Sequence, residues 1–500
     1  MDARQRRRRR LEFGGRINFA EWLPDQPAFE NAGATEAKNV IPAAKGYTSF
    51  QDLGAVSGAA TNDIRGMYAA KDDDGNTSLY VGDEGKLYLF NAADSSLADK
   101  SKSGGYSTSS DDRWRFCQFG ETVLATNFDD NIQAAVAGAA AVFADLGGTP
   151  PKAKFIAVVR DQVMLGYTND GVDGVKPYRL WWSGINSATS WTSGTNLSDY
   201  QDVADLGDCT GLVGGEYAIA LFEKGIVRGQ FVGAPLIYQF DKLSTSRGCS
   251  VPGSVASIGS TVFFLSDDGF YMLSGSELVP IGAEKVNRYF LKRFKSASFA
   301  NVSTAVDPLN QIVVWAFPSV DSADGSNDEL LIYNYVLNRW SRAGVECDVL
   351  APLYTAGYTL EGLDTISTSI DALPASLDSP VYQGGRYFFA AAKDKKVQSF
   401  SGDRLAAVID TGEFQVGKNR SLVNTVIPYV DGQSPTITAQ VGSRALPYDD
   451  VTFSTATSIT SEGFVPVRSE GRYHRVRLNI SGIWDQAQGV DVDARATGLR

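Results

Sequence analysis

Histidine and cysteine are scarce in this sequence, and their scarcity excludes several kinds of chemistry. The 500 residues include one histidine, His474, and four cysteines: Cys117, Cys209, Cys249 and Cys347. No two cysteines form a C-x-x-C pair, so we expect buried free thiols rather than a zinc site or a redox motif. A single histidine excludes multi-histidine metal sites. Because His474 lies in the alternating run 471–478, we interpret it as a structural strand residue rather than a catalytic base.

Motifs for cofactors, metals and catalysis are also missing. The sequence has no P-loop, no G-x-G-x-x-G after a strand and no EF-hand spacing. Residues 266–270 approach a sialidase-type Asp box but place Gly269 one position early and lack its tryptophan. The carboxylate pairs lie in turn-like contexts, where Asx turns explain them. We therefore predict no catalytic, cofactor-binding or metal-ligating residue and no enzymatic activity, although a glycoside acid/base pair stays open.

Long apolar runs are absent as well. No window reaches the roughly 18 to 20 apolar residues that would span a bilayer, and the arginine-rich beginning is followed by no apolar segment of the kind found in a secretory signal. We expect neither a membrane protein nor a secreted one.

Fifty glycines, with many turn residues and β-branched or aromatic residues, indicate a mainly β protein. From residue 60 to 403 a strand, a short Gly or Asp turn and a second strand recur, most clearly at 79–90, 217–227 and 261–273. Most copies begin about 40 to 55 residues apart, the size of a four-stranded propeller blade. Six or seven such units predict a β-propeller, and a pair of β-sandwiches is the alternative.

The pattern divides the chain into four parts. We predict a basic extension at 1–19, an extended arm at 20–59, the propeller-like body at 60–403 with an inserted loop near 355–385, and a β-sandwich at 404–500. Short helices are expected at 131–144, which is rich in alanine, and at 284–293, where apolar residues have helical spacing.

The charge of this chain is strongly uneven. Its net charge of −12 argues against a general nucleic-acid binder. The exception is a basic block near the start, formed by Arg6, Arg7, Arg8, Arg9 and Arg10. This block either contacts phosphates or an acidic partner surface, or is a solvated tip.

Residues 20–50 combine backbone constraints with apolar side chains. Prolines and glycines forbid a continuous helix or a central strand in so short a run. The apolar anchors of this arm are Trp22, Leu23, Phe29, Val40, Ile41 and Tyr47. An extended arm, laid over its own domain or over a neighbour, satisfies both features.

Three segments of this chain resemble structural proteins from the tails of short-tailed bacteriophages. The first is W-x-P-D-x-P-x-x-x-N-x-G leading into A-K-N-V-I-P and G-Y, from Trp22 to Tyr47. The second is W-S-G with a tryptophan seven residues on, from Trp182 to Trp191, and the third is the ending at 471–478 followed by 489–492. The basic block at 6–10 departs from the family, so its role is not carried over.

This resemblance implies a tail hub or nozzle, a head–tail connector component of the virion that is assembled in the host cytoplasm. It implies a homo-oligomeric ring of six copies below the portal and adaptor proteins, with tail fibre or tailspike proteins alongside. Double-stranded DNA would pass through the lumen without specific binding and leave during DNA ejection. An acidic wall would let the DNA backbone slide, because it provides no counterion-releasing contacts.

Two other functions remain open at this stage. A carbohydrate-binding or glycoside-cleaving propeller acting on host surface glycans would use Trp181, Trp182 and Trp191 as a stacking platform, although strand packing explains these residues too. An intracellular scaffold propeller ranks last because the WD and kelch blade signatures are absent.

Overall fold

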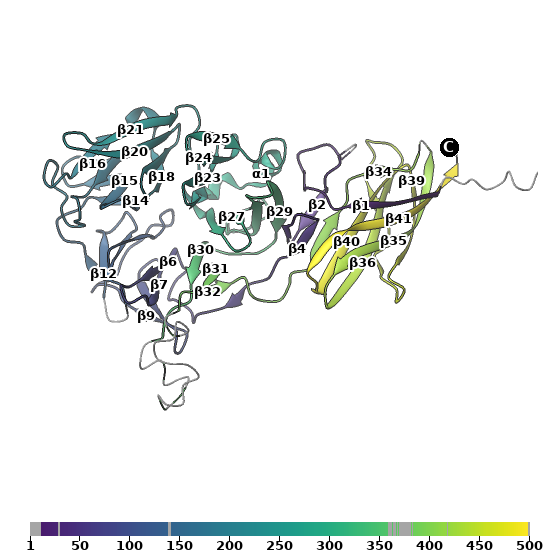
Figure 1. Ribbon diagram of the computed structural model, residues 1–500, viewed down its shortest axis with the longest axis horizontal. Coiled ribbons are helices and arrows are strands. Elements are labelled where there is room, and N and C mark those ends of the chain that lie inside the picture. Colours follow the sequence, from purple (N-terminus) through teal and green to yellow (C-terminus); the bar gives the residue numbers. More distant parts are fainter. Residues whose placement is uncertain are drawn as a thin grey trace, which may run out of the picture.

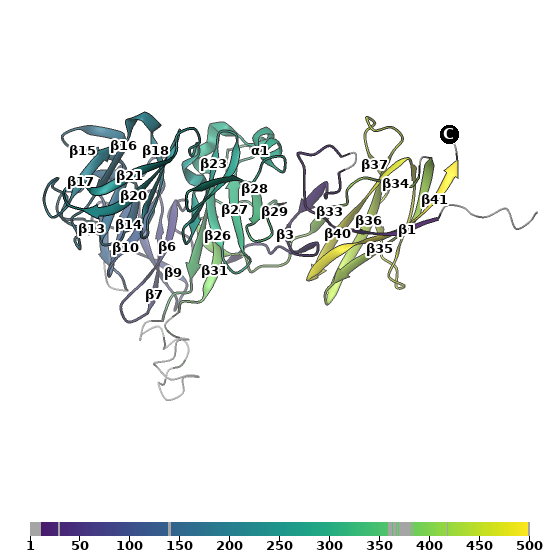
Figure 2. The ribbon, with the colours of Figure 1, turned by 45° about the horizontal axis from the view of Figure 1, so that its top comes forward.

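The computed structural model describes residues 12–28, 31–138, 142–358, 384–417 and 419–498, together with Leu363, Ser367, Ser369 and Tyr382. It is mainly β, with a propeller and a sandwich arranged end to end (Figures 1 and 2). The basic block at 6–10, Phe29 and most of the loop predicted near 355–385 lie outside the described residues. No helix in the described part of the chain is long and apolar enough to cross a membrane.

The propeller consists of seven four-stranded antiparallel blades; six are separate sheets, and blade six is part of a larger sheet of eleven strands. Blades one to four are β6 (Gly66–Lys71), β7 (Thr77–Gly82), β8 (Leu87–Asn91) and β9 (Ser96–Asp99); β10 (Arg115–Phe119), β11 (Thr122–Thr126), β12 (Gln133–Val136) and β13 (Ala144–Asp145); β14 (Lys152–Val159), β15 (Gln162–Asp170), β16 (Gly174–Trp182) and β17 (Asp199–Asp202); and β18 (Cys209–Val213), β19 (Ala218–Phe222), β20 (Ile226–Gly233) and β21 (Ile237–Ser244). Blades five to seven are β22 (Ala256–Ile258), β23 (Thr261–Ser266), β24 (Gly269–Ser274) and β25 (Glu277–Pro280); β26 (Ser303–Asp307), β27 (Ile312–Phe317), β28 (Glu329–Asn334) and β29 (Arg339–Ala343); and β30 (Val349–Tyr354), β31 (Tyr387–Lys393), β32 (Lys396–Ser399) and β5 (Gly54–Ala55).

The ring is closed by a strand from the N-terminal side. β5 lies within the segment expected to be an arm, yet it pairs with β32, with Ala55 opposite Gln398 and Gly54 opposite Ser399. Side chains of blades one and seven share one apolar cluster, in which Val81 packs with Leu353 and Val397. The first and last blades are therefore joined both by pairing and by packing.

The predicted hairpins are present, and turn chemistry explains them. β7 and β8 are joined by a turn in which the buried carboxylate of Asp83 accepts hydrogen bonds from the backbone N–H groups of Gly85 (2.8 Å) and Lys86 (2.7 Å). This is an Asx turn, in which an aspartate side chain accepts hydrogen bonds from the backbone that follows it and so stabilises the chain reversal. At the β23–β24 turn Gly269 has φ +136°, a conformation that L side chains rarely adopt.

The sandwich consists of strands from both ends of the chain. Its strands beyond the propeller are β33 (Ala407–Asp410), β34 (Phe414–Gln415), β35 (Arg420–Asp431), β36 (Ser434–Arg444), β37 (Thr452–Phe453), β38 (Thr457–Ser458), β39 (Val465–Gly471), β40 (Tyr473–Ile483) and β41 (Gln486–Gly498). One sheet has the order β3-β4-β41-β35-β39, and β1 (Glu12–Asn18) pairs with β41. β3 (Val40–Pro42) and β4 (Tyr47–Ser49) come from the arm, so the C-terminal body is a sandwich that the N-terminus helps to build.

One helix prediction is confirmed in part and the other is wrong. α1 (Asn287–Arg293) forms within 284–293, and three short 3-10 helices lie at Ala204–Leu206, Pro252–Ser254 and Ser296–Asn301. The alanine-rich segment 131–144 forms β12 and the start of β13 instead of a helix. The reason is tertiary, because Ala135 packs against the aromatic core of blade two while its strand pairs with β11.

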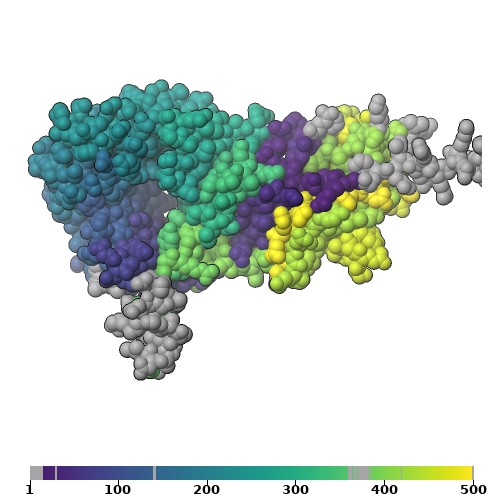
Figure 3. Space-filling model, in the orientation of Figure 1, coloured from purple at the N-terminus to yellow at the C-terminus, as the bar shows by residue number. Residues whose placement is uncertain are grey.

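The arm joins the two bodies through one continuous sheet. β2 (Glu36–Lys38) lies between blade six and the sandwich, parallel to β29 and antiparallel to β33, so that eleven strands belong to a single sheet. The N-terminal residues, purple in Figure 3, lie across the junction between the two bodies. Glu36 holds Arg342 of β29 by two hydrogen bonds of 2.8 Å, a bidentate carboxylate–guanidinium pair.

Asn39 fixes the same junction with its side chain. Its Oδ1 accepts a hydrogen bond from the Gly344 N–H (2.9 Å), and its Nδ2 donates one to the Ala406 carbonyl (2.8 Å). Gly344 follows blade six and Ala406 precedes the sandwich strand β33. Asn39 also has φ +62°, which asparagine tolerates better than most residues.

We predict that Trp22→Ala lowers the free energy of unfolding by about 3–5 kcal/mol, because removal of the indole leaves a large cavity in the core. Trp22 is 1% exposed and packs edge-on against Tyr289, with ring centroids 5.0 Å apart. Urea unfolding followed by circular dichroism measures the loss. Tyr448→Ala is the matched control, because Tyr448 is 81% exposed and should shift stability by only about 0.5 kcal/mol. Equal losses for the two variants would contradict the burial of the arm.

Candidate functional site

The apolar anchors of the arm lie within this chain. Trp22, Val40 and Tyr47 are buried in the core that connects propeller and sandwich, and Leu23 and Ile41 are partly buried. The Tyr47 hydroxyl donates a hydrogen bond to the Ala20 carbonyl at 2.7 Å. These side chains are consequently not available to a neighbouring subunit in this conformation.

Polar residues of the arm motif have specific positions too. Asp25 accepts hydrogen bonds from the Arg288 and Tyr289 N–H groups (2.8 and 2.7 Å), so it caps the first turn of α1 from a distant part of the sequence. Asn31 accepts a hydrogen bond from the Gly33 N–H at 2.7 Å. A Cβ atom on Gly33 would lie 2.6 Å from the Glu21 carbonyl oxygen, so glycine is required there. The polar residues and the glycine of the motif therefore stabilise the arm through contacts within this chain.

The three tryptophans proposed as a sugar platform are not equally accessible. Trp182 and Trp191 are 2% and 3% exposed, and both donate hydrogen bonds to nearby carbonyls. Trp181 is partly exposed and lies against Tyr200, with ring centroids 4.9 Å apart. The Arg179 guanidinium stacks 4.0 Å from the Tyr200 ring centre. Of the three, only Trp181 is partly exposed, and its ring is contacted by Tyr200 and Arg179.

His474 is a buried residue of β40. Its Nε2 lies 2.9 Å from the Ser421 hydroxyl, and neither residue is exposed. Its Nδ1 has no hydrogen-bond partner among the described residues, so no carboxylate orients the ring as a catalytic triad requires. Burial lowers the pKa of His474 to about 4, and the ring is neutral at pH 7.

We predict that His474 makes the fold sensitive to acid between about pH 6.5 and pH 4. The folded-state pKa lies below the unfolded value of 6.5, so the unfolded chain binds the proton preferentially and stability falls as the pH falls through this window. At pH 5 the loss relative to pH 7 is about 2 kcal/mol. Urea unfolding at both pH values, for the native chain and His474→Gln, isolates the effect, since carboxylates contribute equally to both. An unchanged difference between pH 7 and pH 5 in the variant would refute it.

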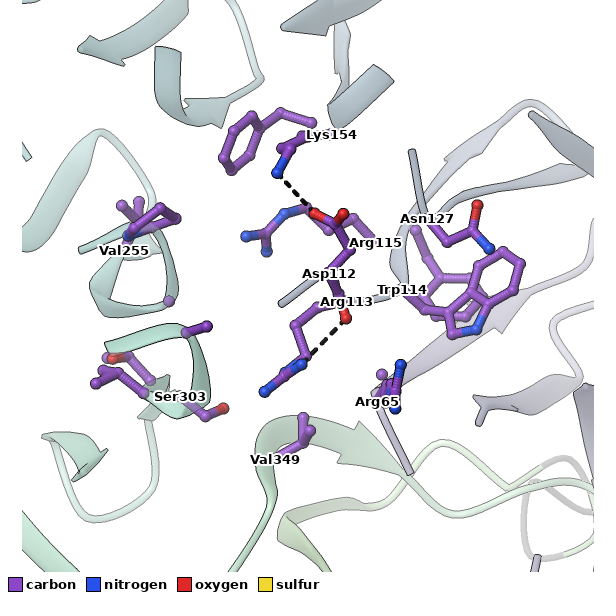
Figure 4. A pocket seen from close by; sticks show the side chains of 18 of the residues that line it. Arg65, Asp112, Arg113, Trp114, Arg115, Asn127, Lys154, Val255, Ser303 and Val349 are labelled. Atoms are coloured by element: carbon purple, nitrogen blue, oxygen red, sulfur yellow. Dashed lines mark hydrogen bonds and ion pairs between the residues drawn. The ribbon is translucent and has the colours of Figure 1, made fainter. Parts of the chain in front are cut away.

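A hollow lined by charged residues lies along the central channel of the propeller (Figure 4). One cavity of about 450 Å³ lies at one end, and a second of about 560 Å³ continues it. The first strand of every blade contributes to the second cavity: β6, β10, β14, β18, β22, β26 and β30. Each of these strands is the edge strand of its blade, so its outer edge faces the channel.

The wall of the first cavity carries both signs of charge. Lys154 forms an ion pair with Asp112 at 2.9 Å, which Figure 4 shows at the edge of the cavity. Arg65 donates hydrogen bonds to the carbonyls of Thr108 (2.5 Å) and Ser109 (2.6 Å).

Arg113 reaches across the mouth of the channel. It comes from the segment before β10, and its guanidinium donates a hydrogen bond to Asn301 Oδ1 at 2.6 Å, just ahead of β26. It also donates to the Ser110 and Asp112 carbonyls (2.8 and 3.0 Å). Burial, followed by the charge of Arg65, lowers the pKa of Arg113, which nonetheless stays charged.

Arg115 differs from the other cations. It lines both cavities, and its guanidinium lies 4.5 Å from the centre of the Phe155 ring. It forms no hydrogen bond or ion pair with any residue that the structure describes. Burial, together with the charge of Arg113, lowers the pKa of Arg115 to about 10. It is therefore a cation without an anionic partner inside the channel.

A smaller hollow of about 260 Å³ adjoins the mouth and is lined by Asp63, Asp324 and Asp348 as well as Arg65 and Arg113. Burial, with the charge of Asp63, raises the pKa of Asp348 to about 6, against a lowering by Arg113. No group of three or more His, Cys, Asp or Glu that could hold a metal ion is found in the described part of the chain. All four cysteines are buried free thiols.

Sequence reasoning missed the channel residues. The one available signal was the run Arg113-Trp114-Arg115-Phe116, in which two cations interrupt an apolar strand pattern. Nothing in the sequence indicates that β10 begins at the propeller axis, or that Asp348 lies across the same mouth. These placements follow from the closure of the ring.

Comparisons with known proteins find structural likeness alone. No protein-family model matches the chain, and no curated protein matches it. The extracellular domain of a protein described as a one component system from B. thetaiotaomicron is similar over 76% of this chain and 44% of its own, with 10% identity and a TM-score of 0.41. The Pan2 WD40 domain of Neurospora crassa is similar over 70% of this chain and 96% of the WD40 domain, with 8% identity and a TM-score of 0.36.

An exo-beta-1,3-galactanase from Phanerochaete chrysosporium is similar over 88% of this chain and all of its own, with 10% identity and a TM-score of 0.29. This chain spans less than half the length of the B. thetaiotaomicron domain. At these TM-scores and identities, nothing about ligands or activity follows for this chain.

Proposed function

We propose that this protein is a structural subunit of the tail hub or nozzle of a short-tailed bacteriophage. Copies would form a ring below the portal and adaptor proteins that retains packaged DNA and releases it on infection. The observation that carries the proposal is the arm, whose phage-like motif from Trp22 to Tyr47 joins the propeller to the sandwich. A wall that withstands the pressure of packaged DNA needs subunits whose two bodies do not move apart.

The dimensions of the channel support a ring lumen rather than a propeller pore. Cavities of about 450 and 560 Å³ hold a small molecule. A DNA duplex, whose major groove alone is about 12 Å wide, does not pass through them. The conduit in this proposal is consequently the space enclosed by several whole subunits, arranged through a heterologous interface. That interface uses surfaces other than the buried anchors of the arm.

Composition in particles tests the proposal directly. Quantitative mass spectrometry of purified particles, combined with imaging of their tails, should find about six copies of this chain per particle, located in the tail, as a closed six-fold ring requires. Absence of the chain from particles would overturn the proposal.

Weak binding of duplex DNA is a second expectation. A chain with a net charge of −12 repels the DNA backbone, and the basic block at 6–10 is its most concentrated source of phosphate contacts. Binding measured by fluorescence anisotropy over a range of salt concentrations should be weak, and deletion of residues 1–12 should remove any salt-dependent part. Tight, salt-sensitive binding that survives this deletion would contradict a sliding conduit.

The second candidate is a propeller that binds or cleaves glycans, which two observations favour. Asp348, with a pKa near 6, and Asp63 lie in one hollow at the channel mouth, and a carboxyl group that holds a proton near neutral pH is what a general acid requires. Trp181, in blade three, is partly exposed, so its side chain could take part in stacking on a sugar.

A glycan array and a hydrolysis assay separate the two candidates. A glycan-active propeller predicts that Asp348→Asn abolishes hydrolysis with binding retained, and that Trp181→Ala weakens binding by about tenfold. Trp191→Ala, at a buried position, controls for a loss of folding. An absence of binding and hydrolysis in the native chain leaves only the structural candidate.

A further inference from the structure

We propose that the central channel of the propeller is a binding site for a small organic anion, one that carries a carboxylate or phosphate group, with Arg115 as the recognition residue. This site is independent of the proposed role in a phage tail, because it lies inside a single subunit. The walls of the second cavity come from all seven blades, and Arg115 lines both cavities.

The four cations that line the first cavity differ in their partners. Lys154 is matched by Asp112, and Arg65 and Arg113 each donate to backbone carbonyls. Arg115 alone among the four has only the face of Phe155 beside it. Its planar fork of N–H donors is suited to bidentate contact with a carboxylate or a phosphate. Contact with the Phe155 ring leaves the N–H groups of this guanidinium without a hydrogen-bond partner among the described residues.

The charge of the cavity selects for an anion. Its lining includes four cations, Arg65, Arg113, Arg115 and Lys154, and two carboxylates, Asp111 and Asp112. Because Arg65 also lies 3.8 Å from the Glu84 carboxylate, one positive charge remains in excess at this cavity, in a chain whose net charge is −12. Walls of low dielectric strengthen the field of charges inside a cleft, so the channel attracts anions that the outer surface repels.

The rest of the lining indicates a small molecule with an apolar part rather than a free inorganic ion. Ile156, Val255, Val302 and Leu350 face the first cavity. Its volume of about 450 Å³ lies in the range of small-molecule sites, which are mostly apolar with a few convergent polar groups.

The environment of Arg115 is consistent with a site that a ligand completes. An unpaired cation in a cavity is unfavourable, and an apolar residue of similar volume at such a site is often neutral or stabilising. The lowered pKa of Arg115 reports the same unfavourable environment. A residue that weakens the fold in this way is expected where a ligand supplies the missing charge.

Thermal unfolding and calorimetry test the site with three variants. The native chain, Arg115→Met, Arg115→Lys and the control Arg160→Met are titrated with inorganic phosphate, citrate and phenyl phosphate at constant ionic strength. Arg160 is a fair control because it also lies over an aromatic ring, with 5.2 Å to the centre of Phe231, but is exposed outside the channel.

We expect at least one organic anion to raise the melting temperature of the native chain and of Arg160→Met. Arg115→Met should melt at or above the temperature of the unliganded native chain and should bind that anion about tenfold to hundredfold more weakly. Arg115→Lys should recover part of the affinity, because it restores the charge without the fork. Citrate and phenyl phosphate distinguish a carboxylate from a phosphate ligand.

Two results would overturn the site. One is binding to Arg115→Met that equals binding to the native chain. The other is that none of the three anions binds the native chain at about 10 mM, a concentration ten times higher than a dissociation constant of about 1 mM. Because the variants are compared in the unliganded state as well, a folding defect in Arg115→Met is visible separately.

Discussion

The architecture depends on the insertion of β2 between blade six and the sandwich. This strand of three residues pairs in parallel with β29 at Lys38 and Arg342, and antiparallel with β33 from Glu36 to Lys38. A short parallel pairing is weak in isolation. Here it is reinforced by the bidentate contact between Glu36 and Arg342, and by Asn39, which links both bodies. The two bodies therefore share one sheet instead of a flexible linker.

The same arm completes three structures in succession. β1, β3 and β4 add strands to the sandwich, β2 joins the bodies, and β5 completes blade seven. β3 pairs locally with β4, but the pairings of β1, β2, β4 and β5 connect residues more than 290 positions apart, so their closure entropy must be offset by packing. Trp22, Val40 and Tyr47 supply that packing with side chains that are almost wholly buried. The apolar anchors of a segment rich in proline and glycine are explained by this demand.

Local signals made the blades predictable, whereas long-range closure was not predictable. Alternating runs and Gly or Asp turns identified the hairpins around Asp83 and Gly269, because these turns are formed by residues close in sequence. The alanine-rich segment was misassigned to a helix because its strand pairing is dictated by β11 and not by propensity. The positions of Arg115 and Asp348 depend on how seven blades close into a ring. No local pattern encodes that geometry.

The two proposals require different charges on different surfaces of the subunit. A conduit for DNA requires a surface without exposed cations, because each phosphate contact adds affinity and friction. A site for a small anion requires unpaired cations. In the propeller the unpaired cation Arg115 lies at the axis, within cavities too small for a duplex. Arg115 is thereby inaccessible to a DNA duplex, so anion recognition at the axis is compatible with the proposed passage of DNA along another surface of the subunit.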